Sequence, residues 1–171
     1  KRMAVYAAMV EAMDFHIGRL IDFLKKSDAL DNTMIIFLSD NGAEGNDPRV
    51  ILENRAWIPR NFDNSIENMG NFDSHISYGP RWAEVSASPY KDFKGFTSEG
   101  GIKSPAFITY KGFKRQESIN DVFLSVMDIA PTILEIANTK YPGERYKGRQ
   151  IYPIKGKSMI NFLMKKENYV H

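Results

Sequence analysis

Apolar residues along this chain follow two patterns, a helical repeat at the start and short continuous runs further on. Residues 3–26 carry an apolar side chain at every third or fourth position, which predicts a long amphipathic helix. Residues 34–39 and 105–110 are short apolar runs bounded by turn residues, which predicts two buried strands. These three segments are expected to form the framework of the fold.

The last part of the chain predicts two further helices with a polar connection between them. Residues 119–137 place their apolar side chains on one stripe. Pro131 is expected to break or restart this helix, with Asp128 capping the restart. Residues 158–166 predict a short final helix. Residues 141–157 are rich in glycine, proline, lysine and arginine, which predicts a surface loop.

The long segment 43–80 shows little periodicity and many turn residues, which is typical of a functional loop or of short helices. We expect such helices at Arg49–Arg55 and Asn64–Met69. Five aromatic side chains lie in this segment or next to it. We interpret them as packing anchors, with the lining of an aryl pocket as the alternative: Trp57, Phe62, Phe72, Tyr78 and Trp82.

The order of helix, strand, long loop, strand and helix favours an α/β unit built of three layers. We expect a mixed, mostly parallel sheet flanked by helices, with residues 34–39 and 105–110 in the same sheet. Residues 1–171 are interpreted as a single piece of one domain.

Composition agrees with a soluble globular domain, since 43% of the 171 residues are hydrophobic and the net charge is +2. The small net charge argues against a nucleic-acid partner. No apolar run is long enough to cross a membrane, so we expect no membrane partner. The absence of cysteine excludes disulfides and thiolate metal sites within this sequence. The compartment stays open between cytoplasmic and periplasmic or secreted.

The candidate chemistry begins where the first strand ends, at Ser39-Asp40-Asn41-Gly42. Sites in open α/β sheets collect just outside the carboxyl ends of strands. Asp40 offers a carboxylate and Asn41 an amide carbonyl, and such oxygen donors suit a hard cation such as Ca²⁺ or Mg²⁺. Taken alone, the motif is better explained by a simple turn, because these residue types dominate turns.

A second motif lies ahead of the second strand. Residues 94–101 read Lys-Gly-Phe-Thr-Ser-Glu-Gly-Gly and lead into the strand through Ile102-Lys103-Ser104-Pro105. Together with Asp40-Asn41-Gly42, this segment resembles the sulfatase family. Members of that family carry Asp-Asn-Gly after one strand, and a lysine ahead of a Gly-Gly turn before the next.

Other segments extend the resemblance from the first helix to about Leu163, and they are similar to the bacterial arylsulfatase branch. They are Asp63-Asn64-Ser65-Ile66-Glu67-Asn68, Tyr78-Gly79-Pro80-Arg81-Trp82-Ala83, Ser88-Pro89-Tyr90 and the run Val126–Leu134. The resemblance implies an alkaline phosphatase-like fold, in part, and the hydrolysis of a small-molecule sulfate ester.

The resemblance also implies roles for single residues. Asp40 and Asn41 would be metal ligands for Ca²⁺, with Mg²⁺ as the alternative, and Lys94 would bind the sulfate in the catalytic site. Glu44 is a weaker candidate for an ion-pairing residue. Gly100 and Gly101 are expected to supply unusual backbone angles beside the site. Three further residues are candidates for the rim of the substrate site, without an assigned role: Tyr78, Arg81 and Trp82.

Several parts of a sulfatase site are missing from the sequence. No cysteine or serine lies in the Cys/Ser-x-Pro/Ala-x-Arg segment that yields the formylglycine nucleophile, and the family's first aspartates and upstream histidines are also missing. We therefore expect an internal or C-terminal-side fragment of a larger enzyme, with residues 141–171 leading toward its C-terminal subdomain. Formylglycine is expected upstream, from either precursor, and the remainder of the parent enzyme is the expected partner. Alone, the fragment is expected to be inactive.

Two alternatives stay open. A phosphate or phosphonate ester hydrolase of the same superfamily would share metal-bearing strand ends, but it often uses Asp-His pairs, whereas this chain has Asp40-Asn41. A non-catalytic metal-binding domain is the alternative of a different class. His16 has no partner motif, and we interpret it as structural or exposed rather than catalytic.

Overall fold

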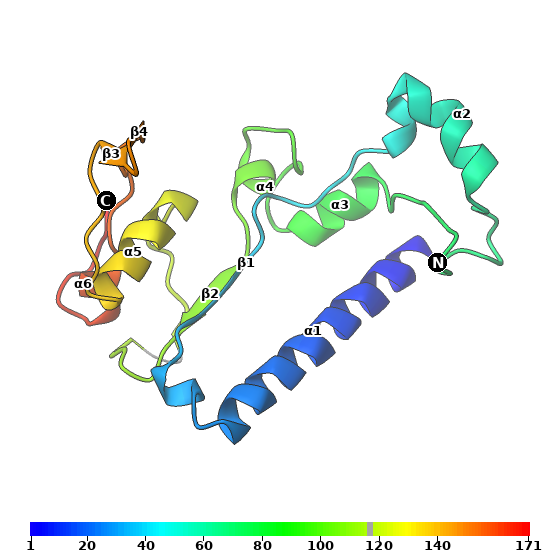
Figure 1. Ribbon diagram of the computed structural model, residues 1–171. Coiled ribbons are helices and arrows are strands. Elements are labelled where there is room, and N and C mark those ends of the chain that lie inside the picture. Colours follow the sequence, from blue (N-terminus) through cyan, green and yellow to red (C-terminus); the bar gives the residue numbers. More distant parts are fainter. Residues whose placement is uncertain (116–117) are drawn as a thin grey trace. The chain divides into compact units, whose positions relative to one another are not determined.

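The computed structural model describes residues 1–115 and 118–171 (Figure 1). The chain divides into two compact units, Lys1–Ile108 and Thr109–His171, and each is described by itself. None of the helices in the described part of the chain has the length and apolar character needed to cross a bilayer.

The first unit begins with helix α1, Arg2–Lys26, which confirms the helix predicted from the apolar repeat. Lys25 and Lys26 lie in its last turn, where cations interact favourably with the helix dipole. None of the residues of α1 is buried by the described residues. A short 3-10 helix, η1 (Leu30–Asn32), links α1 to the first strand.

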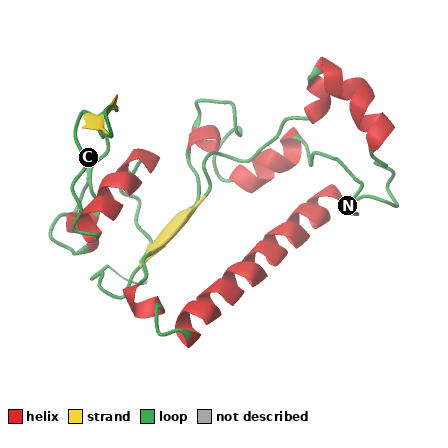
Figure 2. Cartoon of the chain, viewed as in Figure 1, coloured by secondary structure: helices red, strands yellow, loops and turns green. Residues whose placement is uncertain are grey.

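Strands β1, Ile35–Leu38, and β2, Ala106–Thr109, pair in a two-stranded sheet, which confirms that both apolar runs belong to one sheet (Figure 2). The rings of Phe37 and Phe107 stack with their centroids 5.2 Å apart. Contrary to expectation, β1 is only half-buried and β2 is mostly exposed. The described residues add no third strand to this sheet, so the three-layer, mostly parallel arrangement stays a prediction.

The connection between the two strands contains η2 (Pro48–Val50), α2 (Leu52–Asn61), α3 (Pro80–Ala87) and α4 (Glu99–Ile102). The helix expected at 49–55 is therefore present but starts later and continues to Asn61. The helix expected at 64–69 is wrong, because that segment forms turns.

The aromatic residues of this connection pack against one another in part. The rings of Trp57 and Phe62 meet edge-on at 5.3 Å, and Tyr78 lies 4.8 Å from the ring of Tyr6. These contacts support the packing interpretation for three of the five aromatics. Phe72 is fully exposed and anchors nothing among the described residues.

The second unit contains η3 (Val126–Asp128), α5 (Ile129–Ile136) and α6 (Ile160–Leu163). The helix expected over 119–137 is wrong in its first half, because regular structure begins only at Val126. Asp128 stands at the N-cap of α5, and Pro131 lies in the first turn, where a missing backbone N–H costs nothing.

A small hairpin, β3 (Arg145–Tyr146) and β4 (Arg149–Gln150), occupies part of the expected surface loop. Its two-residue turn has φ angles of 47° at Lys147 and 79° at Gly148. Positive φ at both positions is the geometry of the tight turns that join antiparallel strands. The hairpin was not predicted, because it has only two residues in each strand.

Asp128 organises the interior of the second unit, where it is fully buried. Its carboxylate accepts hydrogen bonds from the backbone N–H of Ser125 (2.7 Å), the backbone N–H of Lys157 (2.8 Å) and Nε2 of His171 (2.8 Å). The buried hydroxyl of Thr132 donates to the Asp128 carbonyl. These bonds connect the start of α5 to the segment ahead of α6.

Candidate functional site

Two loops at one end of the β1–β2 pair come together in the first unit. The N–H of Gly42, just after β1, donates to the carbonyl of Gly101 at 3.1 Å, and the N–H of Lys94 donates to the carbonyl of Ala43 at 2.9 Å. The N–H of Ser39 donates to the Pro105 carbonyl at 3.1 Å. Residue numbers rise on one segment as they fall on the other, so the two segments run antiparallel here. The two motifs therefore lie side by side.

The glycines of both motifs allow this close approach. A Cβ atom on Gly42 would lie 2.0 Å from the carbonyl oxygen of Gly100. A Cβ on Gly100 would lie 2.2 Å from the Asp92 oxygen, and one on Gly101 would lie 2.1 Å from the Phe96 oxygen. Side chains have no room at these positions.

The expectation that Gly100 and Gly101 supply unusual backbone angles is wrong. Both residues lie in α4 and neither has a positive φ. The residue of this motif with left-handed φ is Gly95, at 99°. The glycine pair is required because the backbone carbonyls around it are close, and the sequence pattern does not distinguish this reason from a conformational one.

Lys94 and Glu44 form an ion pair between the two loops, with Nζ and Oε2 2.8 Å apart. The side chains are 43% and 49% exposed. The hydrogen bond to Glu44 raises the pKa of Lys94, and the charges of Glu44 and Asp40 add to that rise. The same hydrogen bond lowers the pKa of Glu44. Both groups are therefore charged at neutral pH, and the ammonium group stands beside the loop that carries Asp40 and Asn41.

Asp40 is exposed and Asn41 is partly buried. The Asn41 amide N–H donates to the Gly42 carbonyl at 3.1 Å, which leaves its side-chain oxygen as an acceptor. The donor set of these two residues fits a hard cation. Among the described residues, no group of three or more His, Cys, Asp or Glu side chains is placed to hold a metal. The chain's described residues thus supply at most part of a coordination shell.

The remaining candidates have different surroundings. Burial raises the pKa of Tyr78, and the nearby charge of Glu44 adds to the rise, so this side chain belongs to the same neighbourhood. Arg81 and Trp82 lie exposed on α3. His16 is exposed on α1, with its Nδ1 atom 3.1 Å from Nη1 of Arg19, in agreement with the expectation that it is structural or exposed.

Sequence reasoning did not identify Ser98, which lies between Lys94 and the glycine pair. Its hydroxyl oxygen is buried and has no hydrogen-bond partner in the described part of the chain. A serine within a turn-rich motif gives no signal that its hydroxyl becomes buried.

The chain is similar in sequence to several known proteins. The family described as Sulfatase matches residues 1–139. An uncharacterized sulfatase of Schizosaccharomyces pombe is 48% identical over 94% of this chain and 29% of its own length. An arylsulfatase of Klebsiella aerogenes is 38% identical over 93% of this chain and 34% of its own length. The human steryl-sulfatase is 28% identical over 90% of this chain and 22% of its own length.

The chain belongs to the sulfatase family, which confirms the resemblance drawn from the two motifs. Family membership implies an alkaline phosphatase-like fold. The chain spans between about a fifth and a third of the length of these curated relatives.

Proposed function

We propose that this chain forms one face of the active site of a sulfuric ester hydrolase of the arylsulfatase type, and that the rest of a larger parent enzyme forms the other face. The observation that carries the proposal is the convergence of the two motifs. Backbone hydrogen bonds fasten the Lys94 loop to the Asp40-Asn41 loop, and the ammonium group of Lys94 is held in place by Glu44.

Lys94 is the proposed sulfate-binding residue. Its ammonium group is charged, partly exposed and able to donate three hydrogen bonds. The bridging oxygen of a sulfate ester gains negative charge as the S–O bond breaks, and a positioned cation stabilises that charge. Glu44 restricts the rotamers of Lys94 before the substrate arrives, which lowers the entropic cost of placing the charge.

Asp40 and Asn41 are the proposed metal ligands of this face. Ca²⁺ takes roughly six to eight oxygen ligands, so these two would be completed by residues of the parent enzyme. When bound, such a cation polarises a sulfate oxygen as a Lewis acid. The formylglycine nucleophile is likewise proposed to come from the remainder of the parent enzyme.

The test is a comparison of ester substrates with the parent enzyme. We expect hydrolysis of 4-nitrophenyl sulfate to exceed hydrolysis of 4-nitrophenyl phosphate by kcat/KM, because the relatives that this chain matches carry sulfatase names. Release of 4-nitrophenol is followed by absorbance. A preference for the phosphate ester would instead favour the related phosphate or phosphonate hydrolases. Inactivity toward both, with the nucleophile in place, would favour a non-catalytic domain.

A further inference from the structure

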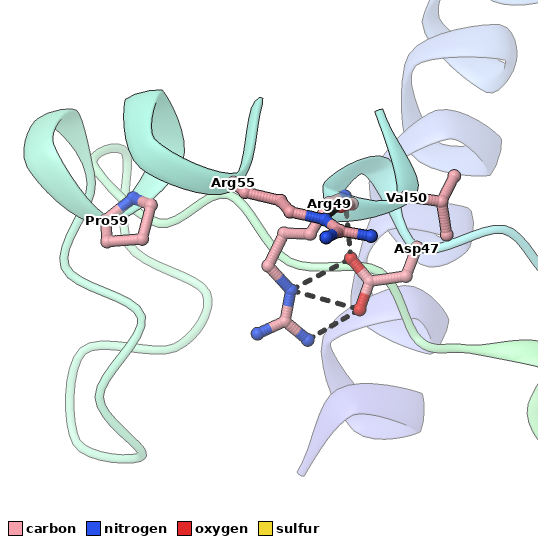
Figure 3. A pocket seen from close by; sticks show the side chains of 5 residues that line it. All are labelled: Asp47, Arg49, Val50, Arg55 and Pro59. Carbon is pink, nitrogen blue, oxygen red and sulfur yellow. Dashed lines mark hydrogen bonds and ion pairs between the residues drawn. The ribbon is translucent and has the colours of Figure 1, made fainter. Parts of the chain in front are cut away.

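A charged hollow lies on the segment that follows the candidate site, between η2 and α2 (Figure 3). It is open, has a volume of about 420 Å³, and is lined by Asp47, Arg49, Val50, Arg55 and Pro59. Two guanidinium groups and one carboxylate line it, so its net charge is positive.

The first of these arginines is neutralised by the carboxylate. Nε of Arg49 lies 3.0 Å and 3.1 Å from the two carboxylate oxygens of Asp47, and Nη2 lies 2.5 Å from Oδ2. The backbone N–H of Arg49 also donates to Asp47, at 2.9 Å. These hydrogen bonds lower the pKa of Asp47 to about 2. Asp47 and Arg49 are therefore both charged, and their opposite charges cancel.

Within the part of the chain that the structure describes, the second arginine, Arg55, forms no ion pair with an acid. Its Nε donates to the Arg49 carbonyl at 3.2 Å, and this hydrogen bond positions the Nε end of the guanidinium group. In the ranges 1–115 and 118–171, its two Nη groups make no hydrogen bond or ion pair. Nδ2 of Asn54 donates to the Pro48 carbonyl at 3.0 Å, and this hydrogen bond links the start of α2 to η2. Arg55 is thus a positioned donor with open hydrogen-bonding capacity.

We propose that this hollow binds an oxyanion carried by the organic part of the substrate, at a distance from the sulfate that is cleaved. The proposal rests on the proposed function. A guanidinium group matches the paired oxygens of a carboxylate or sulfate, and the apolar walls, Val50 and Pro59, suit a carbon skeleton.

The hollow and the proposed sulfate site lie close together in the sequence. Asp47 follows Glu44 by three positions, so their Cα atoms are at most about 11 Å apart. Glu44 is the partner of Lys94, and the hollow therefore begins close to the proposed sulfate site along the chain. The substrate class is a sulfate ester whose aglycone or sugar bears a second anionic group.

The test uses the parent enzyme and three aryl sulfates with the same flexible arm, which ends in a hydroxyl, a carboxylate or a second sulfate. In the wild type, we expect a lower KM for an anionic arm than for the hydroxyl arm. Arg55→Gln is expected to raise that KM about tenfold or more, because a hydrogen bond to a charged group is worth about 1.5–3 kcal/mol. KM for the hydroxyl arm and kcat should stay unchanged.

Arg60→Gln is the matched control, because Arg60 is exposed on the same helix but does not line the hollow. If Arg55→Gln raises KM only for the carboxylate arm, or only for the sulfate arm, that arm identifies the oxyanion that the hollow binds. Equal KM values for all three arms in the wild type would overturn the proposal, as would equal effects of Arg55→Gln and Arg60→Gln. If the proposed function is wrong, the wild-type enzyme should instead hydrolyse none of the three aryl sulfates.

Discussion

Replacement of Lys94 by alanine in the parent enzyme is expected to lower kcat for 4-nitrophenyl sulfate by about 10²–10³. Loss of one positioned donor that stabilises developing charge typically has an effect of this size. The variant retains the backbone hydrogen bond from residue 94 to the Ala43 carbonyl, so the loop should keep its place. Steady-state kinetics provide the measurement, after each variant has been shown to fold and to carry the modified nucleophile.

The chain offers a matched control for Lys94. Lys103 forms an equivalent ion pair with Glu99, at 2.9 Å, and both side chains are similarly exposed. Because an exposed ion pair contributes little to stability and Lys103 lies outside the proposed sulfate site, Lys103→Ala should change kcat by a few-fold at most. Lys91→Ala, which removes another loop charge, should behave likewise. If either control lost activity while Lys94→Ala stayed near wild type, the sulfate-binding lysine would be assigned wrongly.

Replacement of Asp128 by alanine is expected to loosen the second unit strongly. The change leaves the backbone N–H groups of Ser125 and Lys157, and Nε2 of His171, without their acceptor. Breaking a buried pair of this kind typically costs about 3–5 kcal/mol. Amide hydrogen exchange in the parent enzyme measures the effect, and the amides of Ser125 and Lys157 should exchange more than about a hundredfold faster.

The pH dependence of this stabilisation has a definite sign. Burial raises the pKa of Asp128, but the hydrogen bonds from His171, Lys157 and Ser125 outweigh burial, so the folded pKa lies below its ordinary value of 3.8. The stabilisation is therefore present above that value and is lost as the pH falls through the lower, folded pKa.

Asp121→Ala is the control for Asp128→Ala. Because Asp121 is exposed in the same unit, its replacement should leave amide hydrogen exchange nearly unchanged. Equal effects of the two substitutions would contradict the proposed role of Asp128.

The sequence predicted those features that depend on local patterns. The apolar repeat of residues 3–26 and the run at 34–39 became α1 and β1 with boundaries close to those expected. The placement of β1 and β2 in one sheet followed from the order of helices and apolar runs along the chain.

Features that depend on distant contacts were not predictable. The helix expected from residue 119 does not form until Val126, although the apolar stripe begins earlier. Among the described residues, Ile119 is fully exposed and Phe123 is mostly exposed, so this part of the stripe gains little from burial. The contact between Asp128 and His171 joins positions far apart in the sequence, and neither residue carries a signal for the other. The packing role of Gly42 depends on the carbonyl of Gly100, which a local pattern cannot place.

A crystal structure of the parent enzyme with Ca²⁺ and inorganic sulfate bound tests the central claim most directly. We expect Asp40 and Asn41 both to be among the Ca²⁺ ligands, and Nζ of Lys94 to donate a hydrogen bond to an oxygen of the bound sulfate. Ca²⁺ bound without these two residues, or a sulfate in the active site that makes no contact with Lys94, would contradict the account.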